Sequence, residues 1–117
     1  MHYKPEIVVK WFAEHGIYAV PEYRFDDMRK WRFDFALSKL IEGRQGENAL
    51  RNRIAKLALE VQGGLFTNGR HARGASLLKE HEKLNAAACA GWRILYCVPD
   101  DLCMPETVEM IQKALSR

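Results

Sequence analysis

The sequence has few cysteines and no long apolar run. Its 117 residues include only Cys89, Cys97 and Cys103, with no CxxC pair, so we expect reduced thiols rather than a zinc site or a disulfide framework. No apolar stretch approaches the roughly 18 residues that span a bilayer, and no secretory signal opens the chain. These absences predict a cytoplasmic protein with no membrane partner.

The composition fits one folded domain spanning residues 1–117. Hydrophobic residues make up 48% of the chain, which is enough for a single core, and we find no internal repeat or low-complexity tract. The net charge is +3 and the pI is near 8.8. A mildly basic protein can bind nucleic acid, but this balance alone does not require it.

Two segments, Lys30–Leu37 and Lys56–Gln62, alternate apolar and polar residues as strands do. If these strands pair through their apolar faces, Asp34, Glu60 and Gln62 meet on the opposite face. The apolar positions are Trp31, Phe33 and Phe35 in the first strand, and Leu57, Leu59 and Val61 in the second.

Two carboxylates side by side in neighbouring strands repel each other, and burial increases the cost. A shared cation removes that repulsion, and oxygen ligands suit Mg²⁺, which also binds substrate phosphates. The Asp34 and Glu60 pair therefore predicts a Mg²⁺ site and is the sharpest functional signal in the sequence.

The remaining patterns predict a helix–strand–strand–strand–helix–strand–helix order and an α/β (α+β) fold, with a mixed sheet flanked by helices. In the second helix, an apolar side is expected at Leu77, His81, Leu84 and Ala88. The other expected elements are a helix at Pro5–His15, a hairpin of Glu22–Phe25 with Trp31–Leu37, a basic loop at Asn68–Gly74, a helix at Ser76–Ala90, a strand at Trp92–Val98 and a helix at Pro105–Leu115. We expect a loop at Glu42–Arg53, with a short helix near Asn48–Arg53 as the alternative.

An aspartate in the second strand, E-x-Q in the third, then a helix and a returning strand resemble the PD-(D/E)XK nuclease superfamily. The run RKWRFDFA…KLALEVQGG…GRHARG…EKLNAAACAGWRIL is similar to small phage and bacterial nucleases near the very-short-patch-repair-like branch, and it extends from Glu22 to about Pro99. The resemblance implies a restriction-endonuclease-like core, a Mg²⁺-dependent DNA endonuclease for which Mn²⁺ substitutes, and a bacterial or phage-infected cell.

By this resemblance, Asp34 and Glu60 are the metal-binding acids, and the backbone carbonyl of Val61 is a further ligand. Gln62 stands where the family motif usually has lysine. A glutamine lacks the positive charge that would orient water or stabilise the phosphorane, so catalysis would rely more on the metal.

The family often adds an acid from the first helix to the site. By spacing, Glu6 is the first choice for this acid, with Glu14 and Glu22 as rivals.

Several basic and polar residues are candidates for DNA contact. Arg70, His71 and Arg73 could bind phosphate oxygens, although an ordinary soluble loop explains them too. Lys83 and Asn85 follow in the helix expected to cover the site, and one of them could supply the charge that Gln62 lacks; the alternative is simple surface solvation.

The leading hypothesis is a metal-dependent DNA endonuclease, with a homodimer expected where two strands are cut. The absence of an appended recognition domain slightly favours structure-selective cutting, such as junction resolution or repair nicking, over cleavage at a specific sequence. The main alternative is a catalytically inactive nucleic-acid-binding module of the same fold, which Gln62 favours. A third is a structural protein whose carboxylates face water, and which no metal stabilises against heat.

Overall fold

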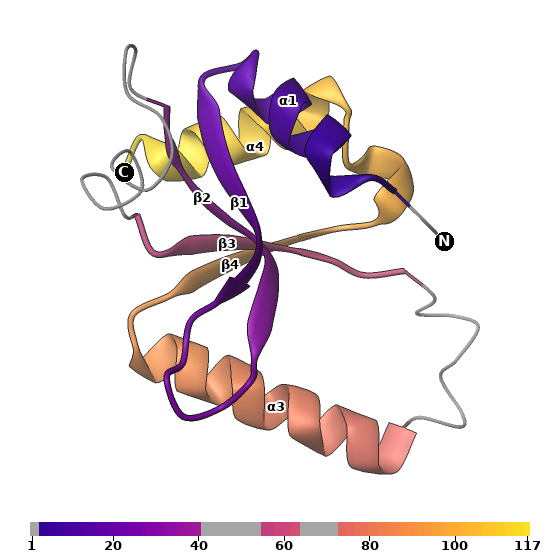
Figure 1. Cartoon of the computed structure of the whole chain (residues 1–117), viewed down its shortest axis with the longest axis vertical. Coiled ribbons are helices and arrows are strands. Elements are labelled where there is room, and N and C mark those ends of the chain that lie inside the picture. The colour runs from indigo at the N-terminus through magenta and orange to yellow at the C-terminus, as the bar shows by residue number, and fades with distance from the viewer. Residues whose placement is uncertain (1–2, 41–54, 64–72) are drawn as a thin grey trace.

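The computed structural model describes residues 3–40, 55–63 and 73–117. These residues form a small α+β protein with an N-terminal helix, a four-stranded mixed sheet and two further α-helices (Figure 1). In chain order the elements are α1 (Pro5–Ala13), β1 (Ile17–Arg24), β2 (Arg32–Lys39), β3 (Leu57–Val61), α3 (Arg73–Cys89), β4 (Arg93–Cys97), the 3₁₀ helix η1 (Pro99–Asp101) and α4 (Pro105–Leu115).

The strands lie in the order β1-β2-β3-β4, so each strand pairs with its neighbour in sequence. β1, β2 and β3 form an antiparallel meander, whereas β3 and β4 are parallel and the chain crosses between them through α3. The predicted element order and mixed sheet are confirmed. Within the described residues, no helix is long and apolar enough to cross a membrane.

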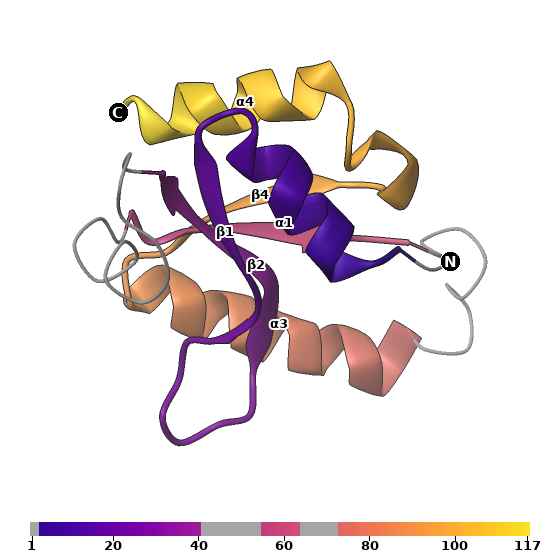
Figure 2. The ribbon, with the colours of Figure 1, turned by 45° about the horizontal axis from the view of Figure 1, so that its top comes forward.

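Helices cover both faces of the sheet: α1 and α4 lie over one face and α3 lies over the other (Figure 2). The larger core lies under α1 and α4, where Phe12, Phe35, Leu59 and Ile111 are fully buried. A smaller core lies under α3. It contains Phe33, Ala58 and Ala87, with Tyr23, Phe25, Trp92 and Ile94 packed against them.

The predicted alternation along β2 is wrong at its N-terminal end. Phe33 belongs to the core under α3, whereas Phe35 belongs to the core under α1 and α4, so the two aromatic side chains lie on opposite faces. Between their partners on β1 stands Glu22, whose φ of +52° is rare for a residue with a side chain. The change of face on β2 thus lies opposite a local distortion of β1, which no sequence period encodes.

The start of α3 differs from the predicted start of the second helix at Ser76. This helix begins at Arg73, so the predicted basic loop does not continue to Gly74, and the segment Glu42–Arg53 lies outside the described residues. The predicted apolar side of α3 is also wrong, because Leu77 is 47% exposed and His81 is exposed. By contrast, α4 has the bounds that its sequence predicts, with Val108, Ile111 and Leu115 buried.

Candidate functional site

The site lies where β2 and β3 stop pairing. Their register ends at Phe35 opposite Leu59, so Asp34 and Glu60 are the next residues on each strand. The backbone N–H of Asp34 donates to Oε2 of Glu60 at 2.8 Å, and the backbone N–H of Val61 donates to Oδ2 of Asp34 at 2.7 Å. The two carboxylates thus replace ladder hydrogen bonds and bridge the opening between the strands.

The backbone geometry of β3 explains why the N–H group of Val61 can donate a hydrogen bond to Asp34. The N–H of Gln62 donates to the Cys97 carbonyl of β4 at 2.8 Å. Successive N–H groups of a strand point to opposite edges, so the N–H of Val61 points towards β2. Asp34 supplies the acceptor for this partly buried N–H, which has lost its ladder partner on β2.

A lysine from α3 completes the group. Nζ of Lys83 lies 2.6 Å from Oε1 of Glu60; the Glu60 side chain is buried, at 7% exposed, and the Lys83 side chain is only 13% exposed. The same ammonium lies 5.6 Å from the ring of Phe33. Low exposure makes this ion pair different from a surface contact, since breaking it would leave a charge with little solvation.

The electrostatics of Glu60 reflect two opposing effects. Burial raises the pKa of the Glu60 carboxyl, while the hydrogen bonds from Lys83 and from the Asp34 N–H lower it. The negative charge of Asp34 adds to the upward shift, and the net direction is a raised pKa. The site therefore holds the negative charge of Glu60 with difficulty, chiefly because this carboxyl is buried.

Two further side chains respond to the charge of Asp34. Burial raises the pKa of Tyr3 to about 12, with added contributions from Asp34 and then Glu22. Burial also raises the pKa of Cys97 to about 11, followed by the effects of Asp101 and Asp34. Both groups stay protonated near neutral pH, so each is a neutral neighbour of the acid pair.

The structure brings together only some of the site residues that the sequence predicts. Asp34, Glu60 and Lys83 converge, and Val61 joins them through its backbone. Gln62 is the first residue after β3, and it is half-buried. Glu6 is exposed on α1. In the described segments no three His, Cys, Asp or Glu side chains gather as a metal-binding cluster, so Glu6 does not form a triad with the acid pair.

Glu22, the rival on β1, lies between the pairs Pro21–Phe35 and Tyr23–Phe33 of the β1–β2 register. Its exposed carboxylate lies 3.9 Å from the Arg32 guanidinium, so in the described segments it does not form a metal-binding cluster with Asp34 and Glu60 either.

The predicted DNA-binding residues have different outcomes. Arg70 and His71 lie outside the described residues, and Arg73 is the first residue of α3. Asn85 is exposed on α3, whereas Lys83 turns inward to Glu60. Lys83 is therefore the one of these side chains whose contact with the acid pair can be described.

Sequence patterns missed Tyr3 and Tyr96 as neighbours of the site. Tyr96 stands opposite Glu60 in the parallel register of β3 and β4, is 44% exposed, and has a pKa raised by burial and then by Glu60. The register of a parallel pair joined by a helix cannot be read from a single sequence. Tyr3 precedes α1 and packs near Phe35, with ring centroids 6.0 Å apart, which no local pattern signals.

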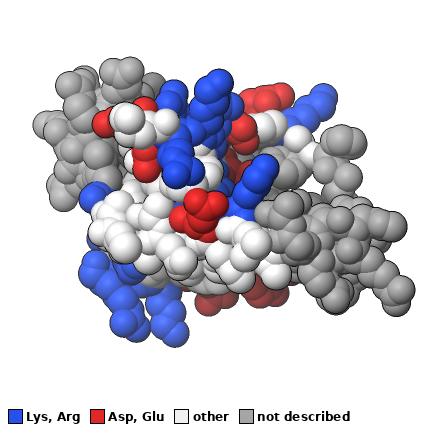
Figure 3. Space-filling model, turned by 90° about the horizontal axis from the view of Figure 1, so that it is seen from below, with Lys and Arg blue, Asp and Glu red and all other residues white. Residues whose placement is uncertain are grey.

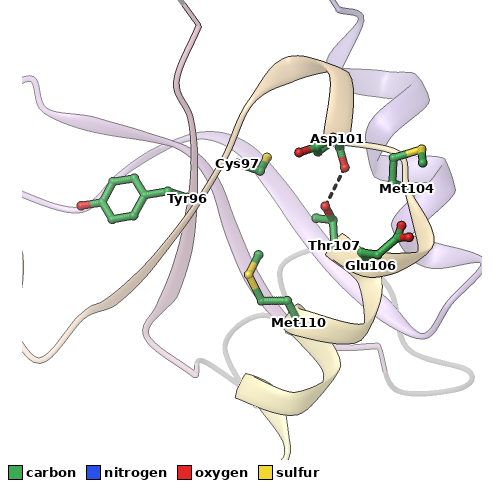
Figure 4. Close-up of a pocket in the computed structure, with 7 residues that line it drawn as sticks. All are labelled: Tyr96, Cys97, Asp101, Met104, Glu106, Thr107 and Met110. Carbon is green, nitrogen blue, oxygen red and sulfur yellow. Dashed lines mark hydrogen bonds between the residues drawn. The ribbon is translucent and has the colours of Figure 1, made fainter. Parts of the chain in front are cut away.

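A separate pocket of about 340 Å³ lies at the C-terminal end of β4 (Figure 4). Its walls include Cys97, Asp101, Thr107 and Met110, and the Thr107 hydroxyl donates to the Asp101 carbonyl at 2.6 Å. Neither Asp34 nor Glu60 lines it. The acid pair and this pocket are thus neighbouring but distinct features.

Comparisons with protein-family models, with curated proteins and with solved structures give no match for this chain. Its function is therefore argued from the chemistry of Asp34, Glu60 and Lys83.

Proposed function

We propose that this chain is a metal-dependent DNA endonuclease of the restriction-endonuclease-like class. The observation that carries the proposal is the convergence of Asp34 and Glu60 across the opening between β2 and β3, with the Asp34 N–H 2.8 Å from the Glu60 carboxylate. Two acids at the end of a strand pair, where backbone pairing stops, can present carboxylate oxygens to a cation that also binds a substrate phosphate. The sequence resemblance to the PD-(D/E)XK superfamily supports the same assignment.

The donor set fits a hard divalent cation in part. Within the described chain, Oδ1 of Asp34 accepts no hydrogen bond, so it is available as a ligand, and the Val61 carbonyl is adjacent. Both oxygens of Glu60 already accept hydrogen bonds, one of them from Lys83. Asp34, Glu60 and Val61 would hold Mg²⁺ or Mn²⁺, and Lys83 would have to release Glu60 for the acid to bind fully.

A bound Mg²⁺ supplies Lewis-acid polarisation of the phosphate and a lowered pKa for water. The chain's own residues account for the rest. Lys83 supplies a positive charge that can move from Glu60 to a phosphate oxygen, where it stabilises the charge that develops during hydrolysis. This role replaces the charge that Gln62 lacks.

Contacts with DNA extend the site beyond the acid pair. We assign Arg70, His71 and Arg73 to phosphate binding, since basic side chains supply most of the sequence-independent affinity for DNA. One acid pair serves one strand, so cutting both strands of a duplex needs a homodimer.

The test is a cleavage assay on supercoiled plasmid, on flaps and on four-way junctions with Mg²⁺ or Mn²⁺. The proposal predicts nicked or linear product that EDTA abolishes. No product on any of these substrates with either metal would exclude a nuclease.

A second function, an inactive nucleic-acid-binding module, is favoured by one observation. The Lys83–Glu60 ion pair occupies an acid that a metal would need, and Gln62 adds no charge to the site. Retained DNA binding with no cleavage under either metal would select this alternative.

A further inference from the structure

Strand β4 is an edge strand of the sheet. Its neighbour on one side is β3, and in the described part of the chain no strand lies on its other side. The N–H of Arg93 and the carbonyl of Cys97 each make a 2.8 Å hydrogen bond towards the β3 side. Because successive residues of a strand bond to opposite edges, the N–H and C=O groups of Ile94 and Tyr96 point away from β3. Backbone groups in such a row can pair with another strand.

The two edge strands differ in the features that discourage pairing. At the other edge, β1 contains Pro21 and a φ of +52° at Glu22, and a proline or a local distortion interrupts regular pairing. Strand β4, Arg93–Cys97, has no proline and no charged residue after its first position. Tyr96 and the adjoining Val98 are 44% and 40% exposed. A regular, apolar edge of this kind favours a partner strand.

A second copy of β4, running antiparallel, matches this edge residue by residue. With a two-fold axis at Leu95, Ile94 of each copy stands opposite Tyr96 of the other copy, and each such pair exchanges both backbone hydrogen bonds. An aromatic side chain opposite a β-branched one is a favourable cross-strand pair. Ile94 packs in the core under α3 and Leu95 in the core under α1 and α4, so apolar side chains would continue across the junction on both faces.

Charge along α4 is arranged in the same antiparallel sense. Two hollows of about 340 Å³ each lie between β4 and α4, and Met110 lines both. Lys113 and Arg117, near the end of α4, line one hollow, whereas Asp101 and Glu106, near its start, line the other (Figure 4). Figure 3 shows basic and acidic side chains intermixed on the side of the molecule seen from below, without this separation. An antiparallel second copy places the basic end of each α4 beside the acidic end of the other.

We propose that β4 pairs antiparallel with β4 of a second copy of this chain, around a two-fold axis at Leu95, and joins the two sheets into one. A strand of another protein could use the same backbone groups, but the charge order along α4 matches a second copy. The inference goes beyond the proposed function, because the pairing does not need the acid pair to be catalytic.

The pairing also sets the distance between the two acid pairs. Glu60 stands opposite Tyr96 in the register of β3 and β4, one residue from the two-fold axis. Three strand spacings and an offset of two residues place the two copies of Glu60 roughly 16 Å apart, on the same face of the joined sheet. Two acid pairs on one face suit the homodimer that cutting both strands of a duplex needs.

The first test is sedimentation of the full chain, without DNA or metal, over a range of concentrations. Wild type should show a monomer–dimer equilibrium. Lys113→Glu should raise the dissociation constant roughly tenfold, since the two-fold axis repeats each altered contact. Adding Glu106→Lys to the same chain restores opposite charges between the copies and should return the dissociation constant close to that of wild type.

The double reversal also separates pairing from helix stability. Positions 106 and 113 lie about 10 Å apart along α4, so they make no direct pair within one chain. A lysine at the start of α4 and a glutamate in its last turn both oppose the helix dipole, so each reversal should lower the melting temperature. Dimerisation should therefore recover in the double variant while thermal stability falls further. Lys79→Glu, at an exposed position on α3, is the control and should leave the dissociation constant unchanged.

The second test removes the outward backbone donor. Tyr96→Pro deletes an N–H that points away from β3, where an edge strand tolerates proline, and should abolish the dimer. Tyr96→Ala keeps this N–H and should retain a weaker dimer. The melting temperature shows whether the proline variant is folded, and if it is not, the charge reversals decide.

A wild type that stays monomeric at about 1 mM would overturn the inference. So would a dimer that is insensitive to a folded Tyr96→Pro variant, or one that the double reversal weakens more than Lys113→Glu does. A dimer with the expected responses, in a protein that cuts no DNA, would support the pairing of β4 and contradict the nuclease. Cleavage by a protein that stays monomeric would do the reverse.

Discussion

Asp34 and Glu60 are joined by a hydrogen bond from the backbone of one to the side chain of the other, 2.8 Å long, at the point where β2 and β3 cease to pair. Asp34 in turn accepts the N–H of Val61 at 2.7 Å. The acids that we assign to metal binding therefore also hold the two strands together. Substitutions that keep a hydrogen-bond acceptor separate these two roles.

Asp34→Asn should abolish cleavage and leave DNA binding unchanged or tighter. The amide oxygen can still accept the Val61 N–H, while a negative charge next to phosphate is lost. Plasmid cleavage and anisotropy measure the two effects. Asp27→Asn, at an exposed loop acid, is the control and should cleave normally. Normal cleavage by Asp34→Asn would remove Asp34 from the site.

Lys83→Met should destabilise the fold by about 3 kcal/mol near neutral pH, because it leaves the buried Glu60 carboxylate unpaired. Adding Glu60→Gln should restore much of the loss. Denaturant unfolding of the two single variants and the double variant measures this coupling. Lys79→Met, at an exposed position on α3, should change stability little. Additive effects of Lys83→Met and Glu60→Gln would mean that the ion pair contributes nothing.

The raised pKa of Glu60 gives stability a defined pH dependence. Folded protein keeps this proton above the ordinary carboxyl value of 4.5, so it binds more protons than the unfolded chain. The contribution of Glu60 to the free energy of unfolding therefore falls as pH rises from 4.5 through the raised value, by at most about 1.4 kcal/mol per pH unit. Urea unfolding across this range should show a shallower fall for Glu60→Gln. Identical slopes for the variant and the wild type would contradict the assignment.

Divalent metal should raise the melting temperature of the wild type, since ligands that bind only the folded state stabilise it. Asp34→Asn should lose this effect. The Lys83→Met variant should show a larger metal-induced shift than the wild type, because the ammonium no longer competes for Glu60. Differential scanning with Mn²⁺ and with EDTA measures all three proteins. A smaller shift in Lys83→Met would mean that this lysine assists metal binding.

Much of the fold is encoded in local patterns of the sequence. Pro105 at the start of α4 and its buried Val108, Ile111 and Leu115 give a helix with the predicted bounds. The alternation in the third strand identified Leu57 and Leu59 as core residues.

The site was harder to predict, because its geometry depends on departures from periodicity. Phe33 and Phe35 lie on opposite faces of the sheet, and a period of two along β2 cannot encode that change. The inward side of α3 includes a charged residue, Lys83, because its partner Glu60 is buried on the facing strand. Hydrophobic spacing favoured His81 instead, since a pattern of apolar residues cannot recognise a buried ion pair.

The measurement that tests the central claim most directly is the anomalous diffraction of crystals soaked in Mn²⁺. We expect a peak between the carboxylates of Asp34 and Glu60, with Nζ of Lys83 moved away from Oε1 of Glu60. A crystal soaked in Mn²⁺ that shows no peak between these carboxylates, and in which the 2.6 Å contact between Lys83 and Glu60 is intact, would contradict a metal site formed by the two acids.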